Sequence, residues 1–203
     1  MRLDKLQKKD YGKAIDFAVK GMHFDWYLND GLLLALYGKY FLYMELCRAT
    51  QVIAAYEGNT LTGILLADFK GEKKVCFSFW KNLYVKFFGT LQNIFAKGSA
   101  DVYDMANKEM FSEYSEKNSP DGEIIFLAAD QNAKAKGIGT ALLNELERRE
   151  QGKNVYLYTD SGCTYQFYEH RGFTLSGERN ITLEIGGKSV PLVCMFFTKQ
   201  IKN

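Results

Sequence analysis

The chain has 203 residues, of which 47% are apolar and 25% are charged, a balance typical of a globular protein. This length allows a hydrophobic core without disulfide staples, so we expect residues 1–203 to form a single domain. A net charge of only +2 gives no reason to expect a nucleic-acid partner.

Secretion, membrane insertion and metal binding are not indicated either. The charged N-terminal sequence MRLDKLQKKD is unlike a signal peptide, and no run of about 20 apolar residues predicts a membrane-spanning helix. The cysteines lie far apart and form no CxxC pair, so they predict neither a zinc site nor a redox motif. We therefore expect a cytoplasmic protein with no metal and no membrane partner, and with reduced thiols at Cys47, Cys76, Cys163 and Cys194.

Two aspartates and one glycine turn define the predicted elements of the N-terminal part. Asp10 and Asp30 are typical N-cap residues, and each stands before a run with helical character. Glu57-Gly58-Asn59 lies between two apolar runs and is typical of a hairpin turn. We expect, in chain order, a strand at 2–7, helices at 10–19 and 32–47, and hairpin strands at 51–56 and 61–69.

The segment at about 75–120 is predicted to be a helical insert, with its second helix at about 101–114. Its first part carries an apolar stripe at helical spacing, formed by Trp80, Tyr84, Phe87, Phe88, Leu91, Ile94 and Phe95. We favour packing within the insert as the role of this stripe. A homodimer face and a lid over an acceptor are alternatives, and a membrane-surface helix ranks last.

The C-terminal half predicts strands and helices that end in a hairpin around Gly186-Gly187. We expect strands at 124–129 and 155–159, helices at 137–150 and 164–171, and hairpin strands at 173–183 and 190–199. Mixed strands and helices with many hairpins predict the α+β (mixed α/β) class. The expected architecture is a mixed, mostly antiparallel sheet flanked by helices.

The most informative segment is Lys134-Ala-Lys-Gly137-Ile-Gly139-Thr140, which lies between an apolar strand and an amphipathic helix. The first turn of a helix has N–H groups without intrahelical partners, and the helix dipole adds positive charge there. Two glycines remove side chains, so a diphosphate can approach those amides, and Lys134 and Lys136 add charge. The segment therefore predicts a diphosphate-binding loop.

A turn that binds nothing, a P-loop and a dinucleotide-binding loop are the alternatives to this interpretation. A GxG pair by itself is weak evidence, because a tight strand-to-helix turn that binds nothing explains it equally well. The P-loop pattern GxxxxGK[ST] is absent from the chain. Leu142 takes the place of the third glycine of a dinucleotide-binding loop, so that loop fits poorly as well.

A second motif follows the loop, since residues 167–173 read Phe-Tyr-Glu-His-Arg-Gly-Phe. In this order and spacing, the two motifs resemble the Arg/Gln-x-x-Gly-x-Gly/Ala and Phe-Tyr-Glu-x-x-Gly-Phe motifs of the GNAT superfamily of N-acetyltransferases. The resemblance covers about residues 123–175. Two positions depart from it: Lys134 lacks the planar fork of arginine, and Ser161 stands where many members have asparagine.

The resemblance implies a GNAT-like fold, acetyl-CoA as cosubstrate, no metal, and a set of site residues. The backbone of Leu127, Ala128 and Ala129 would pair with the pantetheine arm. Tyr168 would lie near the sulfur and protonate the leaving thiolate, and Ser161 lies at a further cofactor position. The diphosphate would be held by the loop residues Lys134, Ala135, Lys136, Gly137, Ile138, Gly139 and Thr140.

The candidate catalytic residues also have plainer interpretations. Outside the motif, Tyr168 would be a packing residue in a chain with 13 tyrosines, and Tyr165, one turn earlier, competes for its role. Glu123 is a weaker candidate for a base that acts through water. Cys163 lies near the expected thiol site, where a small buried residue is the default interpretation.

These observations predict transfer of an acetyl group from acetyl-CoA to a primary amine of a small-molecule or peptide acceptor. Acceptor pockets in such folds come from variable loops, so the sequence does not identify the acceptor. The alternative function is a non-catalytic acyl-CoA-binding sensor, from which a measurable rate of CoA release with an amine would distinguish the enzyme. An interaction protein without cofactor binding is disfavoured by the glycine pair and Tyr168.

Overall fold

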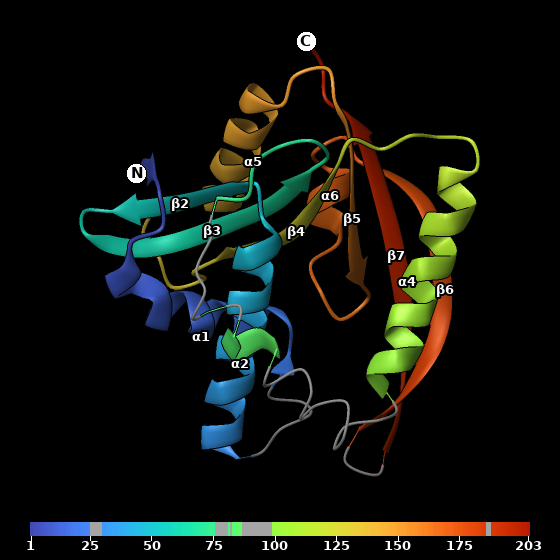
Figure 1. Ribbon diagram of the computed structural model, residues 1–203, viewed down its shortest axis with the longest axis horizontal. Helices are drawn as coiled ribbons and strands as arrows, with labels where there is room; N and C mark the ends of the chain where they lie inside the picture. The colour runs from blue at the N-terminus through green and yellow to red at the C-terminus, as the bar shows by residue number, and fades with distance from the viewer. Residues whose placement is uncertain (25–29, 76–80, 82, 87–98, 186–187) are drawn as a thin grey trace. The chain divides into compact units, whose positions relative to one another are not determined.

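The computed structural model covers residues 1–203 and describes all of them except 25–29, 76–80, 82, 87–98 and 186–187 (Figure 1). The chain divides into two compact units. The first unit comprises Met1–Phe88 and Ile124–Gln151, and the second comprises Gly89–Glu123 and Gly152–Asn203. That residues 1–203 form a single domain stays a prediction.

The first unit holds three helices and the strands that they cover. Its helices are α1 (Tyr11–Gly21), which follows a 3-10 turn at Lys8–Asp10, α2 (Gly31–Arg48) and α5 (Ile138–Arg149). Its strands are β1 (Arg2–Asp4), β2 (Gln51–Glu57), β3 (Thr60–Phe69) and most of β4 (Gly122–Ala129). The second unit contains α4 (Ser99–Ser115), β5 (Asn154–Asp160), the short α6 (Gln166–Glu169), β6 (Thr174–Ile185) and β7 (Lys188–Gln200).

The described strands form one seven-stranded sheet in the order β1-β2-β3-β4-β5-β7-β6. The pairs β1–β2, β2–β3, β5–β7 and β6–β7 are antiparallel. The first two residues of β4 pair in parallel with β5, through Gly122–Val155 and Glu123–Tyr156. A mixed, mostly antiparallel sheet with flanking helices confirms the predicted fold class.

Helices lie on both faces of the sheet in the first unit (Figure 1). Ala14 of α1 and Leu42 of α2 belong to a buried core that includes Ala54 of β2 and Ile64 of β3. Successive residues of a strand point to opposite faces, so Gly63 points away from this core, and α5 approaches the sheet there. The period-3.6 pattern predicted this packing, since Ile138, Leu142 and Leu146 of α5 are buried.

The two predicted helix caps have different outcomes. Asp30 caps α2 as predicted, because its Oδ1 accepts a hydrogen bond from the Leu33 N–H at 2.9 Å. Asp10 takes the N-cap position of α1 as predicted, but its side chain makes no capping hydrogen bond. Its Oδ2 instead accepts a hydrogen bond from the Tyr56 hydroxyl at 3.0 Å, which ties the start of α1 to β2.

In the second unit, α4 covers one face of the β6–β7 hairpin. Ala106 and Met110 of α4 pack against Cys194 and Phe196 of β7 in a buried cluster. The ring of Tyr156 on β5 extends this cluster, with its centroid 5.4 Å from that of Phe196. The second helix predicted for the insert is therefore present and buries an apolar face against the sheet.

The first part of the predicted insert is described only in places. Lys81 and residues 83–86 are helical, and the Tyr84 hydroxyl donates a hydrogen bond to the Leu36 carbonyl of α2 at 3.3 Å. The remaining stripe residues lie outside the described residues: Trp80, Phe87, Phe88, Leu91, Ile94 and Phe95. Within the part of the chain that the structure describes, no helix is long and apolar enough to cross a membrane.

Glu145 of α5 forms two ion pairs within its helix. The Arg148 Nε lies 2.8 Å from one carboxylate oxygen, and the Arg149 Nε lies 2.9 Å from the other. The hydrogen bond from Arg148 is the largest cause that lowers the pKa of Glu145 to about 2. Since this pKa is lower in the folded than in the unfolded state, the pairs stabilise the folded chain above the ordinary pKa of about 4.5.

We expect Glu145→Gln to lower the free energy of unfolding at pH 7 by about 0.5–1 kcal/mol, the usual contribution of two exposed helix pairs. The difference from the parent should shrink as the pH falls from about 4.5 toward 2, because both proteins then carry a neutral side chain. Urea denaturation at several pH values measures it. A difference that does not change with pH would contradict the electrostatic origin.

Candidate functional site

The predicted diphosphate loop ends at a left-handed glycine that begins α5. Gly137 has φ 72° and ψ 23°, and a Cβ built on it meets no atom within 4 Å. The first intrahelical bond runs from the Ala141 N–H to the Gly137 carbonyl at 2.9 Å. The N–H groups of Ile138 and Gly139 lie in the first turn, before that bond, where the helix itself supplies no acceptor. The loop therefore combines an exposed glycine with a helix end that carries partial positive charge.

Gly63 of β3 fixes how closely α5 approaches the sheet, and the sequence analysis did not single it out. A Cβ at Gly63 would lie 2.5 Å from Ile138 Cγ2, 3.1 Å from Leu142 Cδ1 and 3.1 Å from the Ala128 carbonyl oxygen. Real Cβ atoms essentially never come within 3.0 Å of another heavy atom, so only glycine fits here without a shift. A glycine inside an otherwise apolar strand is the signal that marks such a close approach.

The three β4 residues predicted to pair with pantetheine lie directly before the loop. Leu127 and Ala128 are half-buried, and Ala129 is exposed. The Asp130 N–H donates to the Thr62 carbonyl at 2.8 Å, which fixes the end of β4 to β3. In the first unit, the predicted pantetheine strand and the predicted diphosphate loop are therefore continuous in the chain, and they lead from β4, next to β3 in the sheet, into α5.

Ser161, predicted as a cofactor residue, links two strands of the second unit. Its N–H donates to the Val193 carbonyl at 3.0 Å, and its Oγ accepts from the Val193 N–H at 3.1 Å. The serine therefore ties the end of β5 to β7. This contact gives Ser161 a structural role, and its contact with a cofactor stays a prediction.

Tyr168, the predicted acid, lies on α6 among aromatic side chains. Its ring centroid is 5.7 Å from that of Phe173 and 6.2 Å from that of Phe197. Gly172, with φ 78°, ends the segment in the left-handed conformation, and the Phe173 N–H returns to the Tyr168 carbonyl at 3.1 Å. Burial raises the pKa of the Tyr168 phenol above its ordinary value, with the nearby Cys163 as a second cause. Tyr168 is therefore protonated at neutral pH.

Cys163 is half-buried, and its thiol is protonated at neutral pH. Burial is the largest cause that raises the pKa of its thiol to about 11, and the Asp160 carboxylate adds to it. Asp160 itself accepts hydrogen bonds from the Tyr103 hydroxyl at 3.1 Å and from the Gly162 N–H at 2.8 Å. In the described ranges, no group of three or more His, Cys, Asp or Glu side chains is arranged to hold a metal ion.

Glu123 and Tyr165 are placed in the second unit with Tyr168. The Tyr156 hydroxyl donates to Glu123 Oε2 at 3.3 Å, so a phenol contacts the carboxylate proposed as a base. The carbonyl of Tyr165 accepts from the Tyr168 N–H at 2.9 Å, one turn apart as predicted. The first unit therefore carries the loop and the β4 residues, and the second carries the catalytic candidates.

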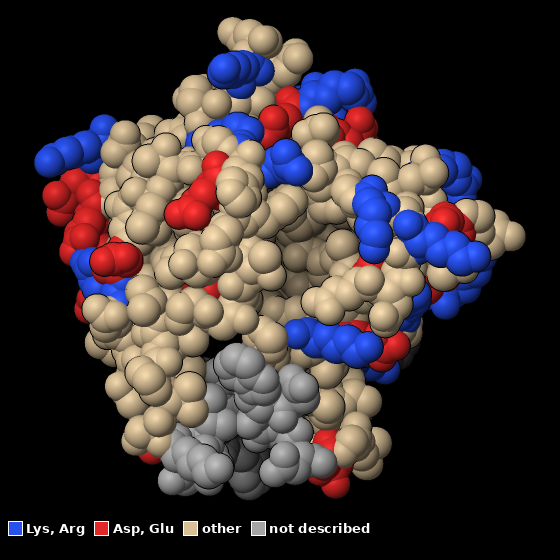
Figure 2. Space-filling model, turned by 180° about the vertical axis from the view of Figure 1, so that it is seen from behind, with Lys and Arg blue, Asp and Glu red and all other residues tan. Residues whose placement is uncertain are grey.

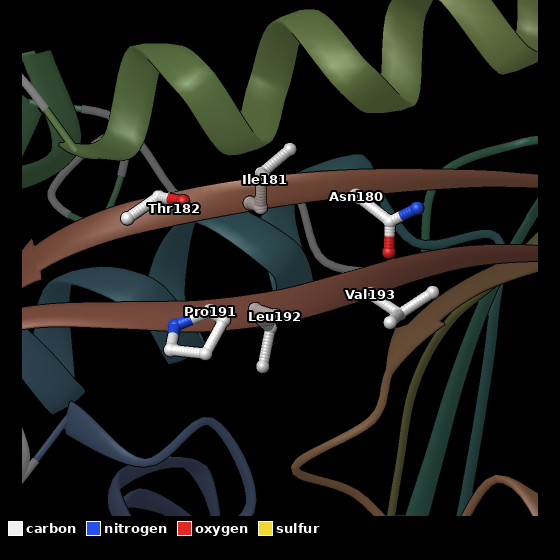
Figure 3. Close-up of a pocket in the computed structure, with 6 residues that line it drawn as sticks. All are labelled: Asn180, Ile181, Thr182, Pro191, Leu192 and Val193. Atoms are coloured by element: carbon white, nitrogen blue, oxygen red, sulfur yellow. The ribbon is translucent and has the colours of Figure 1, made fainter.

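A hollow on the β6–β7 hairpin was not predicted. Figure 3 shows its lining from both strands: Asn180, Ile181, Thr182, Pro191, Leu192 and Val193. Ile181 and Leu192 are paired in the register of the two strands, and Ile181 also packs with the α4 cluster. On the face of the molecule in Figure 2, Lys and Arg side chains lie among Asp and Glu side chains, as a net charge of +2 suggests.

A family model of the acetyltransferase (GNAT) family matches residues 25–173. That range holds both motifs and most of the chain, so the protein belongs to the GNAT acetyltransferase family. A comparison with curated protein sequences gives no match.

Solved acetyltransferase structures share the fold. The histone acetyltransferase HPA2 and related acetyltransferase from Corynebacterium glutamicum ATCC 13032 matches with a TM-score of 0.59 and 18% identity, over 96% of this chain and 93% of that one. The ribosomal-protein-S18-alanine N-acetyltransferase from Escherichia coli gives 0.55 and 12%, over 100% and 94%. An N-acetyltransferase from Staphylococcus aureus Mu50 gives 0.53 and 14%, over 98% and 100%. At these identities the likeness concerns the fold alone.

We expect Gly63→Ala to lower the free energy of unfolding by about 1–3 kcal/mol, because the added methyl overpacks the contact with Ile138. The matched control is Gly12→Ala in α1, where a Cβ meets nothing within 4 Å. That variant should be neutral or stabilised by up to about 1 kcal/mol. Urea denaturation measures the free energy of unfolding of both variants, one with the methyl in a tight contact and one with it in open space. Equal changes in that free energy would contradict the close approach at Gly63.

Proposed function

We propose that the protein is an acetyl-CoA-dependent N-acetyltransferase whose acceptor is a primary amine of a small molecule or peptide. The observation that carries this proposal is the open space at left-handed Gly137, where a helix begins, in a chain of the GNAT family. In the reaction, a bond forms between the amine nitrogen and the acetyl carbon, and the bond from that carbon to sulfur breaks. CoA leaves as the thiol, and the proton that the amine nitrogen loses passes to water, from which the acid that protonated the thiolate is restored.

The residues of the first unit fit the cofactor in chemical terms. A side chain at Gly137 would project into the space where a diphosphate must approach the α5 amides, and glycine leaves that space open. Lys134 and Lys136 are exposed and supply positive charge on the same loop. We assign the diphosphate to residues 134–140 and the pantetheine arm to the backbone of residues 127–129, with Ser161 as a further contact.

We assign the proton that CoA thiolate receives to Tyr168. General acid catalysis requires the acid to be protonated at the working pH, and burial keeps the Tyr168 phenol in that form. A raised pKa also makes the phenol a weaker acid than a free tyrosine. Its contribution therefore lies in a hydrogen bond to the leaving sulfur as the charge develops there, followed by proton transfer.

The alternative is a non-catalytic acyl-CoA-binding sensor. One observation favours it: the Tyr168 ring packs against other aromatic rings, as a purely structural tyrosine would. The two functions differ in turnover, because only the enzyme releases CoA in proportion to amine. We also propose a cytoplasmic location, since Cys47, Cys163 and Cys194 are free thiols.

We expect Gly137→Trp to abolish measurable binding of acetyl-CoA, because the indole fills the space in front of the α5 amides. Gly58→Trp is the matched control, since Gly58 also has a positive φ, 61°, and open space at its Cβ. Both substitutions impose similar backbone strain, but Gly58 lies in the β2–β3 turn. Calorimetry measures the acetyl-CoA affinity of both folded variants. Equal affinities would contradict the assignment of the diphosphate to residues 134–140.

We expect Tyr168→Phe to lower kcat by about 10² to 10⁴ while CoA affinity is unchanged, because only a hydroxyl is removed. In the parent, the raised pKa predicts that Tyr168 contributes no fall in kcat near pH 10. Tyr165→Phe is the comparison, measured with the same amines by CoA release. If only Tyr165→Phe loses activity, the proton donor is Tyr165 and the assignment of Tyr168 is wrong.

A further inference from the structure

Asp130 begins the loop that leads from β4 to Gly137, and all its polar groups are bonded. Its N–H donates to the Thr62 carbonyl at 2.8 Å, and its carbonyl accepts from the Ala133 N–H at 3.2 Å. Its Oδ1 accepts from the Asn132 N–H at 3.0 Å, which closes an Asx turn. Its Oδ2 lies 2.7 Å from the Lys13 Nζ of α1. One residue thus connects the start of the loop to β3 and to α1.

Lys13 is itself held in place on α1. Its Nζ lies 5.7 Å from the centroid of the Phe17 ring, one helical turn along, and Phe17 belongs to the core of the first unit. The hydrogen bond from Lys13 is the largest cause that lowers the pKa of Asp130, and Lys20 adds to the same direction. Asp130 is therefore a carboxylate at neutral pH, and it is paired with a cation of the same unit.

A carboxylate in this position poses an electrostatic problem. Asp130 lies four residues before Lys134. The Cα atoms of these two residues are therefore at most about 14 Å apart, the length of four fully extended residues. A bare negative charge at that range repels a diphosphate, weakly through water and more strongly where water is excluded. Lys13 cancels this charge and leaves the carboxylate free to act as an acceptor for the Asx turn.

We propose that Asp130 is a positioning residue for cofactor binding, and that Lys13 makes its charge compatible with the diphosphate of CoA. The carboxylate holds the turn at residues 130–133, and the ion pair holds that turn against α1. The loop then leaves the sheet in a fixed direction and presents the α5 amides to the ligand. This inference rests on the proposed function of the same loop.

Three variants separate the turn from the charge. Lys13→Met leaves the Asp130 carboxylate without this partner, Asp130→Asn keeps an acceptor for the turn but removes the charge, and the double variant combines both changes. We expect Lys13→Met to weaken acetyl-CoA binding by about tenfold, as for loss of one charged hydrogen bond. Adding Asp130→Asn should recover most of that loss, because the repelling charge is gone. If the Lys13–Asp130 pair has only a structural role, the double variant should bind acetyl-CoA no more tightly than Lys13→Met does.

Asp130→Ala removes both the turn and the pair, so it should raise KM for acetyl-CoA by about tenfold or more and leave kcat unchanged. Acetyl-pantetheine is the control substrate, because it has the thioester but no diphosphate. Its KM should be the same in Asp130→Ala and the parent, whereas a damaged fold raises both values. Melting curves identify any variant that fails to fold, and if Asp130→Ala is one of them, Lys13→Met and the double variant carry the test.

The outcomes separate this inference from the function on which it rests. A parent protein that does not bind acetyl-CoA contradicts the proposed function itself. A parent that binds it, with equal affinity in a folded Asp130→Ala, contradicts only the positioning role. Equal losses for acetyl-CoA and acetyl-pantetheine in a folded variant also contradict it.

Discussion

The close approach of α5 to β3 is the contact on which the candidate site depends. At Gly63 the sheet has no side chain on the α5 face, so Ile138 and Leu142 pack directly on the strand backbone. The first turn of α5 therefore packs closely on the sheet, which gives the amides at its start a defined direction. The loop between Asp130 and Gly137 joins this helix to the sheet. Each end of that loop is anchored, by bonds to Thr62 and Lys13 at one end and by helix packing at the other.

The elements that follow a strong local pattern could be predicted from the sequence. The hairpin around Gly58, the amphipathic α5 and the Asp30 cap depend on neighbours within a few residues, and the structure has each of them. The diphosphate loop could be predicted because its glycines and its helix are contiguous, and its binding role stays a prediction. The family motifs added the function, which no local pattern carries.

The rest depends on contacts between residues that are distant in the sequence. Asp10 has the residue type of a cap, yet Tyr56 recruits its carboxylate, and the two residues are 46 positions apart. Ser161 is likewise engaged by Val193, 32 positions away. Gly63 was not singled out in the sequence, because its partner Ile138 became known only with the fold. The Lys13–Asp130 pair, with 117 positions between its members, has no local signature at all.

The division of the first unit along the chain has a consequence for how the protein folds as it is synthesised. Met1–Phe88 leaves the ribosome first, but β4 and α5, which complete this unit, follow only after Gly89–Glu123. Until then the apolar α5 side of β2 and β3, including Ile53 and Leu65, lacks the helix that covers it. The nascent chain therefore exposes this apolar face of two strands while some sixty further residues are added. At 5–20 residues per second this takes from a few seconds to about ten seconds. This chain order therefore predicts that the nascent chain is prone to aggregate during translation and would benefit from a chaperone.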